Sequence, residues 1–240
     1  MTAILSTSVP LQAEETLRAH GHRTLRLPPH PALPPSLSSH PDMLLFFSQD
    51  AIFCTALYAE IAKEELCEIS RIADRPIKTV LREPERAYPR DVLFNAAPIG
   101  NLLFCRPDAT AQELTEIADL TVVPVRQGYA KCSVIPVGRH AMMTADASIA
   151  KAAKAHSVDV LSLRAGGILL EGYDYGFPGG CTSFCPYGEY ETLYFCGSLS
   201  LYEDGERMKA FCARHGMRTV SLGDFPPTDV GTIFLIESKR

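Results

Sequence analysis

One short pattern of secondary structure recurs five times along the chain of 240 residues. Each time, a stretch with apolar residues at helical spacing precedes a short run of β-forming residues, and a loop then leads to a second such run. The helical stretches span residues 14–19, 56–72, 111–118, 145–156 and 206–215. The β runs that follow them begin at residues 24, 77, 120, 158 and 218. This repeat restricts the chain to folds in which five small units pack together.

The second β run of each unit completes the predicted architecture. These runs lie at residues 43–47, 92–94, 132–137, 182–184 and 232–236. A unit of this kind leaves its sheet edges unpaired, and closing five units into a ring reduces the exposed edges. We therefore predict an α/β fold, a five-unit ββαβ propeller closed into a ring with pseudo-fivefold symmetry, as one domain over residues 1–240. In such a ring, the loops between the two β runs of each unit converge on a central opening.

Composition excludes several classes of protein. The net charge is −5 and no basic stripe is present, so nucleic acid is not an expected partner. No apolar run reaches the roughly 18–20 residues that a membrane helix needs, and residues 1–10 lack the pattern of a secretory signal. The eight cysteines contain no CxxC pair and fit buried thiols of a reducing compartment, not a metal site. We therefore expect a cytoplasmic protein with no membrane partner and no metal, and the sequence makes no prediction of oligomeric state.

Three loops carry residues with the potential for chemistry, at residues 38–42, 126–133 and 170–181. Cys132 is a candidate nucleophile, and a neighbouring cation such as Lys131 or nearby backbone amides could stabilise its thiolate. The imidazole of His40 exchanges protons near neutral pH and is a candidate general acid and base, with Asp42 to orient it. The three loops occupy the same place in their own units.

Further residues are candidates for substrate binding. Glu171 and Asp174 form a pair of carboxylates suited to a planar guanidinium or amidinium cation. Asn95 and Gln127 lie in equivalent loops and could supply hydrogen bonds. Cys181 is a second-choice nucleophile. Each residue also has an ordinary structural interpretation as a core thiol, a turn or a solvated loop, and their combination favours a site.

These motifs resemble those of the guanidino-group-modifying enzymes of the pentein fold. That group includes arginine deiminases, agmatine deiminases and dimethylarginine dimethylaminohydrolases. Residues 128–135 (GYAKCSVI) resemble the glycine-rich loop that carries the nucleophilic cysteine, and residues 40–44 (HPDML) resemble the histidine motif. Residues 170–174 (LEGYD) resemble the acidic motif, with Tyr173 in place of a second glycine. The segment from residue 127 to 176 is still more similar to an uncharacterised bacterial pentein-fold family.

The order of the motifs differs from that of the enzymes. The acidic motif, His40 and Cys132 lie in units four, one and three, and stepping by two around a ring of five reproduces the enzymes' cyclic order. The chain therefore looks circularly permuted relative to them. Its fifth loop, residues 225–231, has no cysteine where the enzymes' last unit carries the nucleophile.

The resemblance implies a hydrolase or transferase that acts on a small guanidino or amidino compound without a cofactor. In a C–N hydrolase of this type, Cys132 attacks the substrate carbon, His40 transfers protons, and Glu171, Asp174 and Asp42 hold the cation. The competing interpretation is an inactive pentein-fold protein that binds a small molecule or a ribosome-type partner. Tyr173 favours that alternative if its ring fills the cavity. An acyl-transfer pair of Cys132 and His40 has no supporting second motif.

Overall fold

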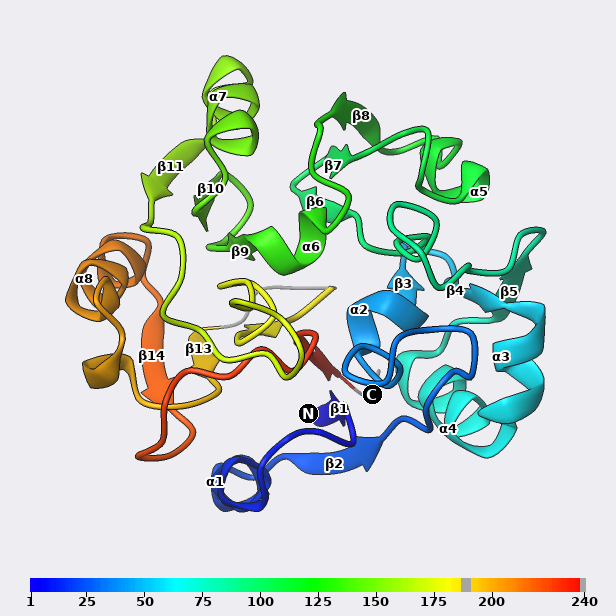
Figure 1. Ribbon diagram of the computed structural model, residues 1–240, viewed down its shortest axis with the longest axis horizontal. Coiled ribbons are helices and arrows are strands. Elements are labelled where there is room, and N and C mark those ends of the chain that lie inside the picture. The colour runs from blue at the N-terminus through cyan, green and yellow to red at the C-terminus, as the bar shows by residue number, and fades with distance from the viewer. Residues whose placement is uncertain (187–190, 238–240) are drawn as a thin grey trace.

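The computed structural model describes residues 1–186 and 191–237. Its strands form five small sheets, which Figure 1 shows as groups placed around the middle of the molecule. In four sheets, one strand has an antiparallel neighbour on one side and a parallel neighbour on the other. The fifth group is the parallel pair β13–β14, beside which Thr182 forms an antiparallel bridge to Phe195.

The elements have the following bounds. The strands are β3 (Phe46–Phe47), β4 (Ile52–Thr55) and β5 (Ile77–Val80); β6 (Ala97–Ile99), β7 (Leu102–Cys105) and β8 (Thr121–Pro124); β9 (Val134–Pro136), β10 (Ala141–Thr144) and β11 (Asp159–Ser162); β13 (Thr192–Phe195) and β14 (Arg218–Ser221); and β12 (Ser183–Phe184), β15 (Ile233–Ile236), β1 (Thr2–Leu5) and β2 (Arg23–Arg26). The helices between parallel strands are α1 (Leu11–Ala19), α3 (Ala56–Ile61), α4 (Lys63–Ala73), α5 (Gln112–Thr115), α7 (Ala147–Ala155) and α8 (Gly205–Arg214), with the 3-10 turn η1 (Leu199–Leu201) before α8. The short helices α2 (Pro41–Leu44) and α6 (Ala130–Ser133) precede β3 and β9.

Burial explains which strands lie inside. Every residue of β1, β4, β10 and β15 is buried, as expected for strands covered on both faces. The parallel strands β2, β5, β8, β11 and β14 are partly exposed and carry polar residues. The helices return the chain from each inner strand to its outer parallel partner. The mixed α/β class predicted from the repeat is therefore confirmed.

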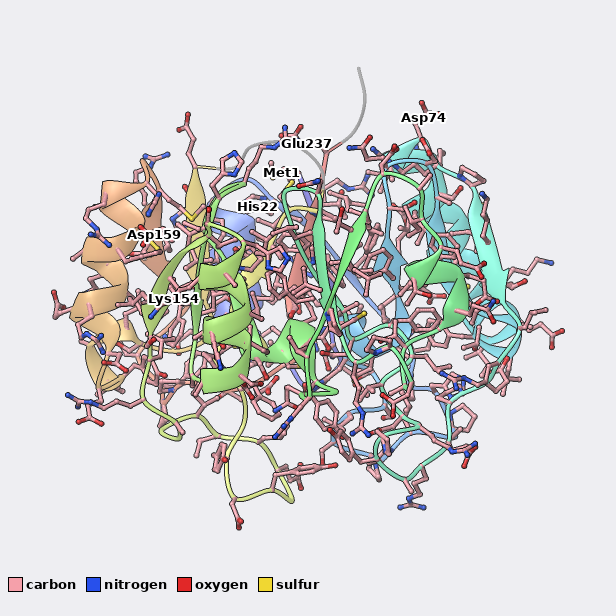
Figure 2. All side chains as sticks on the ribbon, turned by 90° about the horizontal axis from the view of Figure 1, so that it is seen from above. Met1, His22, Asp74, Lys154, Asp159 and Glu237 are labelled. Atoms are coloured by element: carbon pink, nitrogen blue, oxygen red, sulfur yellow. The ribbon has the colours of Figure 1, made fainter. Side chains whose placement is uncertain are left out.

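The two ends of the chain build one sheet together. Strand β15 pairs antiparallel with β1, with Thr2 opposite Ile236, and β1 pairs in parallel with β2. Met1 and Glu237 accordingly lie close together in Figure 2. The loop that follows β11 projects from the opposite face. The sheets therefore do not follow the helix-first units of the sequence pattern, because four of the second β runs join the sheet of the next helix and β12 pairs with β15.

Three predicted β runs are partly wrong. Residues 43–47 begin as helix α2, and only Phe46–Phe47 form a strand. Cys132 lies in α6, and the strand starts at Val134. Residues 92–94 form no strand, and β6 begins at Ala97. Short apolar runs have no periodicity that separates one helical turn from a strand, and Pro41 favours the first turn of α2.

The predicted helices are present with small changes. The stretch 56–72 divides at Ala62 into α3 and α4, and the stretch 111–118 contains only the short α5. Within the described ranges, no helix has the length and apolar character needed to cross a membrane.

Candidate functional site

A buried thiol lies where the short helices α6 and α2 meet the loop before β6. Cys132, in α6, is 3% exposed. Its Sγ donates to Asp42 Oδ2 at 3.2 Å and accepts from Asn95 Nδ2 at 3.0 Å. The amide of Cys132 also donates to Asn95 Oδ1 at 3.1 Å. The loop before β6 and helix α2 thus hold the thiol from two sides.

A chain of directed hydrogen bonds supports Asp42. Lys131 Nζ donates to Thr232 Oγ1 at 3.1 Å, and Thr232 Oγ1 donates to Asp42 Oδ2 at 2.7 Å. An ammonium group only donates, so the Thr232 hydroxyl proton is free to be given to the carboxylate. The ammonium of Lys131 also lies 5.1 Å from the ring centroid of Phe184. Lys131 therefore contacts the thiol's carboxylate partner through Thr232, and the expected direct contact of its ammonium with the thiolate is not formed.

Thr232 adopts a strained backbone to make this contact. Its φ of 65° is in the left-handed region, which β-branched residues rarely occupy.

We expect Thr232→Val to lower the free energy of unfolding by about 1–3 kcal/mol, because it leaves the Lys131 ammonium without its buried acceptor. Thr232→Ser keeps the hydroxyl and should lose much less. Urea unfolding of both variants measures the difference, and equal losses would contradict the role of the hydroxyl.

His40 and Asp229 form a second buried pair beside the thiol. His40 is 1% exposed, and its Nδ1 lies 4.0 Å from Asp229 Oδ1. Asp229 accepts hydrogen bonds from the amides of Phe177 at 2.8 Å and Gly231 at 3.0 Å. Neither ring nitrogen of His40 has a hydrogen-bond partner in the described part of the chain, and Asp42 Oδ1 also has none. Buried polar atoms without partners are costly, so these three atoms indicate bonding capacity reserved for a ligand or water.

Two glycines allow this close packing. A Cβ at position 180 would lie 1.9 Å from Asp229 Oδ1. A Cβ at position 231 would lie 2.1 Å from the Cβ of His40, and the backbone there has φ +72°. Only glycine fits at these positions without moving the carboxylate or the imidazole.

A cavity of about 250 Å³ opens onto the thiol. Two of its lining residues, Cys132 and Asp229, are buried polar residues. The remaining lining residues are mostly aromatic or aliphatic: Leu37, Tyr129, Leu170, Tyr173, Asp174, Tyr175 and Phe177. Tyr173 is 44% exposed and stands on the cavity wall. Its ring therefore leaves space for a ligand beside it.

Burial and negative charge dominate the electrostatics. Burial, with the charges of Asp42 and Asp229, raises the pKa of the Cys132 thiol well above its usual range. Burial also raises the pKa of Asp229, with Asp42 acting in the same direction and His40 opposing it. A cation entering the cavity would favour the ionised forms of both groups. The site is therefore suited to a positively charged ligand.

The predicted site residues divide into two sets. His40, Asp42, Asn95 and Cys132 come together, and Tyr173 and Asp174 line the cavity. The other three predicted residues lie elsewhere. Glu171 is exposed and outside the cavity lining, and Gln127 Oε1 accepts from the amide of Tyr129 within its own loop. Cys181 is buried in the core, with its Sγ 3.4 Å from the carbonyl oxygen of Pro178.

Sequence reasoning missed Asp229 and Thr232. Both lie in the loop just before β15. Cys132 has the same position just before β9, and Asp42 lies at the corresponding place before β3. Their equivalent position in the repeat was the signal that could have identified them.

No set of three or more His, Cys, Asp or Glu side chains suited to a metal ion occurs among the described residues.

The model of a family of unknown function (DUF6873) matches residues 4–234. A search of curated proteins found no match.

Several solved structures share the fold. DDAH from Pseudomonas aeruginosa, a cysteine-to-serine mutant complexed with citrulline, has a TM-score of 0.54 and 13% identity, covering 92% of this chain and 91% of its own. An adduct of a dimethylarginine dimethylaminohydrolase histidine-to-glycine variant with S-methyl-L-thiocitrulline has a TM-score of 0.55 and 13% identity, with the same coverage. C. jejuni agmatine deiminase has a TM-score of 0.54 and 8% identity, covering 92% of this chain and 87% of its own. The predicted resemblance to pentein-fold guanidino-modifying enzymes is confirmed as a similarity of fold.

Proposed function

We propose that this chain, which belongs to the family of unknown function DUF6873, is a cysteine-dependent hydrolase or transferase of small guanidinium or amidinium compounds. The observation that carries the proposal is the Cys132 thiol, which is bonded to Asn95 and Asp42 and opens onto a cavity with Asp229 in its lining. The shared fold with DDAH and agmatine deiminase supports the same class of chemistry.

The substrate cation would complete the site electrostatically. Without substrate, the Cys132 thiol has a raised pKa and donates a hydrogen bond to Asp42. A guanidinium placed between Asp42 and Asp229 offsets the negative charge that opposes thiolate formation. It also offers N–H donors to the unpartnered Asp42 Oδ1. Substrate binding would thus generate the nucleophile, and the empty site would keep an unreactive thiol.

The reaction proceeds in two halves. In the first, the bond from Cys132 Sγ to the central carbon forms and one C–N bond breaks, and the leaving nitrogen takes up the proton released by the thiol. In the second, a water oxygen attacks the same carbon, the S–C bond breaks, and the sulfur regains a proton. A second amine in place of water makes the reaction a transfer. His40, beside Asp229 and with both ring nitrogens unpartnered, is the proposed carrier of protons in both halves.

The proposed roles differ in part from those expected from the sequence. Asp42 and Asp229 hold the reacting cation, Asn95 holds the thiol, and Asp174 with Tyr173 faces the outer part of the substrate. Glu171, Gln127 and Cys181 have no role in the proposal. We also infer a closed ring of five units whose order is a circular permutation of the enzymes', with the β15–β1 sheet joining the two ends of the chain.

A ligand-binding protein without turnover is the second candidate. The full burial and raised pKa of the Cys132 thiol favour it, because an uncharged thiol is a poor nucleophile. The choice between an enzyme and a binding protein depends on whether a cationic ligand converts the Cys132 thiol into a reactive thiolate.

Labelling by a haloacetamidine, an amidinium-bearing alkylating agent, tests the proposal. The native protein at neutral pH should be modified at Cys132, as mapped by mass spectrometry, and His40→Ala should slow that modification. A panel of guanidino and amidino compounds then tests for release of ammonia or an amine. Selective labelling without turnover of any compound would favour the binding protein. Equal or negligible labelling of all cysteines would exclude the enzyme and leave the ligand-binding protein.

A further inference from the structure

The cavity offers no positive charge to a bound molecule. Among the residues that the structure describes, its lining contains two acidic side chains, Asp174 and Asp229, and no lysine, arginine or histidine. The nearby cations have other partners. Lys131 donates to Thr232, and Arg106 binds Asp108 and the hydroxyl of Tyr88. Arg126, which precedes Tyr129 on the same loop, is exposed and outside the lining.

The walls between the buried end and the mouth are aromatic. The ring of Tyr129 stacks on Tyr88 at 5.4 Å between centroids and 24° between planes, and lies 5.7 Å from the ring of Phe177. Its hydroxyl donates to the buried carboxylate of Asp91, which fixes the ring in place. Tyr175 meets Phe177 edge to face. Such walls accept a flat apolar group and offer few hydrogen bonds to a polar one.

The volume limits the size of that group. A cavity of about 250 Å³ lies below the roughly 300–1,000 Å³ of pockets that enclose drug-sized ligands. It is therefore matched to a small aromatic or short aliphatic tail attached to the cationic head.

We propose that the site selects cations whose tail carries no carboxylate, namely amidinium or guanidinium groups on a small apolar or aromatic tail. The inference rests on the proposed function for the position of the cationic head beside Cys132 and Asp229. A carboxylate on the tail would stand near Asp174 with no cation to balance it, and both its desolvation and the like charges oppose binding. Free amino acids such as arginine are accordingly poor ligands, and their decarboxylated counterparts are better.

Direct binding of a matched pair of compounds tests this inference. Benzamidine and 4-carboxybenzamidine differ by one carboxylate, and calorimetry measures both without requiring turnover. We expect benzamidine to bind at least about 10-fold more tightly, and agmatine to bind more tightly than arginine by a similar factor. Asp174→Lys should reduce or reverse the preference within the benzamidine pair. Glu171→Lys makes the same change of charge on the same loop outside the cavity lining and should leave the preference unchanged.

The outcomes separate this inference from the proposed function. Equal or tighter binding of the carboxylated compounds overturns the inference, as does failure of both benzamidines to bind. If Cys132 is selectively labelled by haloacetamidine in either case, the proposed function stands and only the substrate class is rejected. An equal effect of Asp174→Lys and Glu171→Lys would show that overall charge, and not the cavity, sets the preference.

Discussion

Replacing Cys132 by alanine is expected to abolish turnover of any guanidino or amidino substrate, with a loss of at least about 10⁴-fold in kcat. The reason is that, within the described part of the chain, no other cysteine lines the cavity and could form the covalent S–C intermediate. Cys132 is the cysteine in the cavity lining, and its thiol is held by Asn95 and Asp42. Turnover assays over a wide range of enzyme concentration, with alkylation mapped by mass spectrometry, measure the loss.

Cys181→Ala is the matched control for that experiment. Cys181 is also buried, and burial together with the charge of Asp229 raises its pKa, but Cys181 does not line the cavity and its sulfur faces the carbonyls of Phe177 and Pro178. The variant is expected to keep turnover and labelling of Cys132 while losing stability through a small core void. Residual turnover in Cys132→Ala, or its loss in Cys181→Ala, would reassign the nucleophile.

Asp229→Asn is expected to change the reactivity of Cys132 in opposite directions for neutral and cationic reagents. The carboxylate raises the pKa of the thiol, so its removal lowers that pKa and increases the thiolate fraction at a fixed pH below it. The rate with neutral iodoacetamide should rise, roughly tenfold for each unit by which the pKa falls. The rate with haloacetamidine should fall about tenfold or more, because the cation loses a charge-assisted partner in the cavity.

The measurement compares both reagents at pH 8, with the labelled site mapped. Glu171→Gln removes one negative charge from an exposed position outside the lining and should change neither rate. Unfolding is measured in parallel, because Asp229 accepts amide hydrogen bonds at both oxygens and asparagine can accept at only one. Parallel changes with both reagents would indicate altered access to Cys132 and would argue against a cation site at Asp229.

Local sequence patterns predicted the elements that neighbouring residues decide. The helical periodicity of α1, α7 and α8 is complete within each stretch, so those helices were placed to within a few residues. The one-turn helices α2 and α6 overlap the predicted β runs at residues 43–44 and 132–133, because stretches this short carry no period that separates a helical turn from a strand. Their helical form depends on the loops packed against them.

Most of the predicted site residues that come together were found from short motifs of adjacent residues, and Asn95 was found from its place in an equivalent loop. His40-Pro41-Asp42 and the loop before Cys132 were visible as motifs. Asp229 was not, because its contacts are with Phe177, Gly231 and His40, and the last of these lies far away in the sequence. Glu171 was expected in the site since it follows an apolar pair, and the course of its loop leaves it in solvent.

By itself, the sequence determined that five similar units recur and that a thiol, an imidazole and an amide stand at their inner loops. Only the tertiary structure decided which carboxylates face the thiol, because the pairing of β15 with β1 brings Thr232 and Asp229 from one end of the chain to Asp42 and His40 near the other. The tertiary structure also decided the character of the cavity, whose aromatic walls come from loops after β8 and β11. Pairing between the two ends of the chain leaves no pattern among neighbouring residues. The charge of the site and the shape of its cavity are therefore set by the tertiary contacts between the loops.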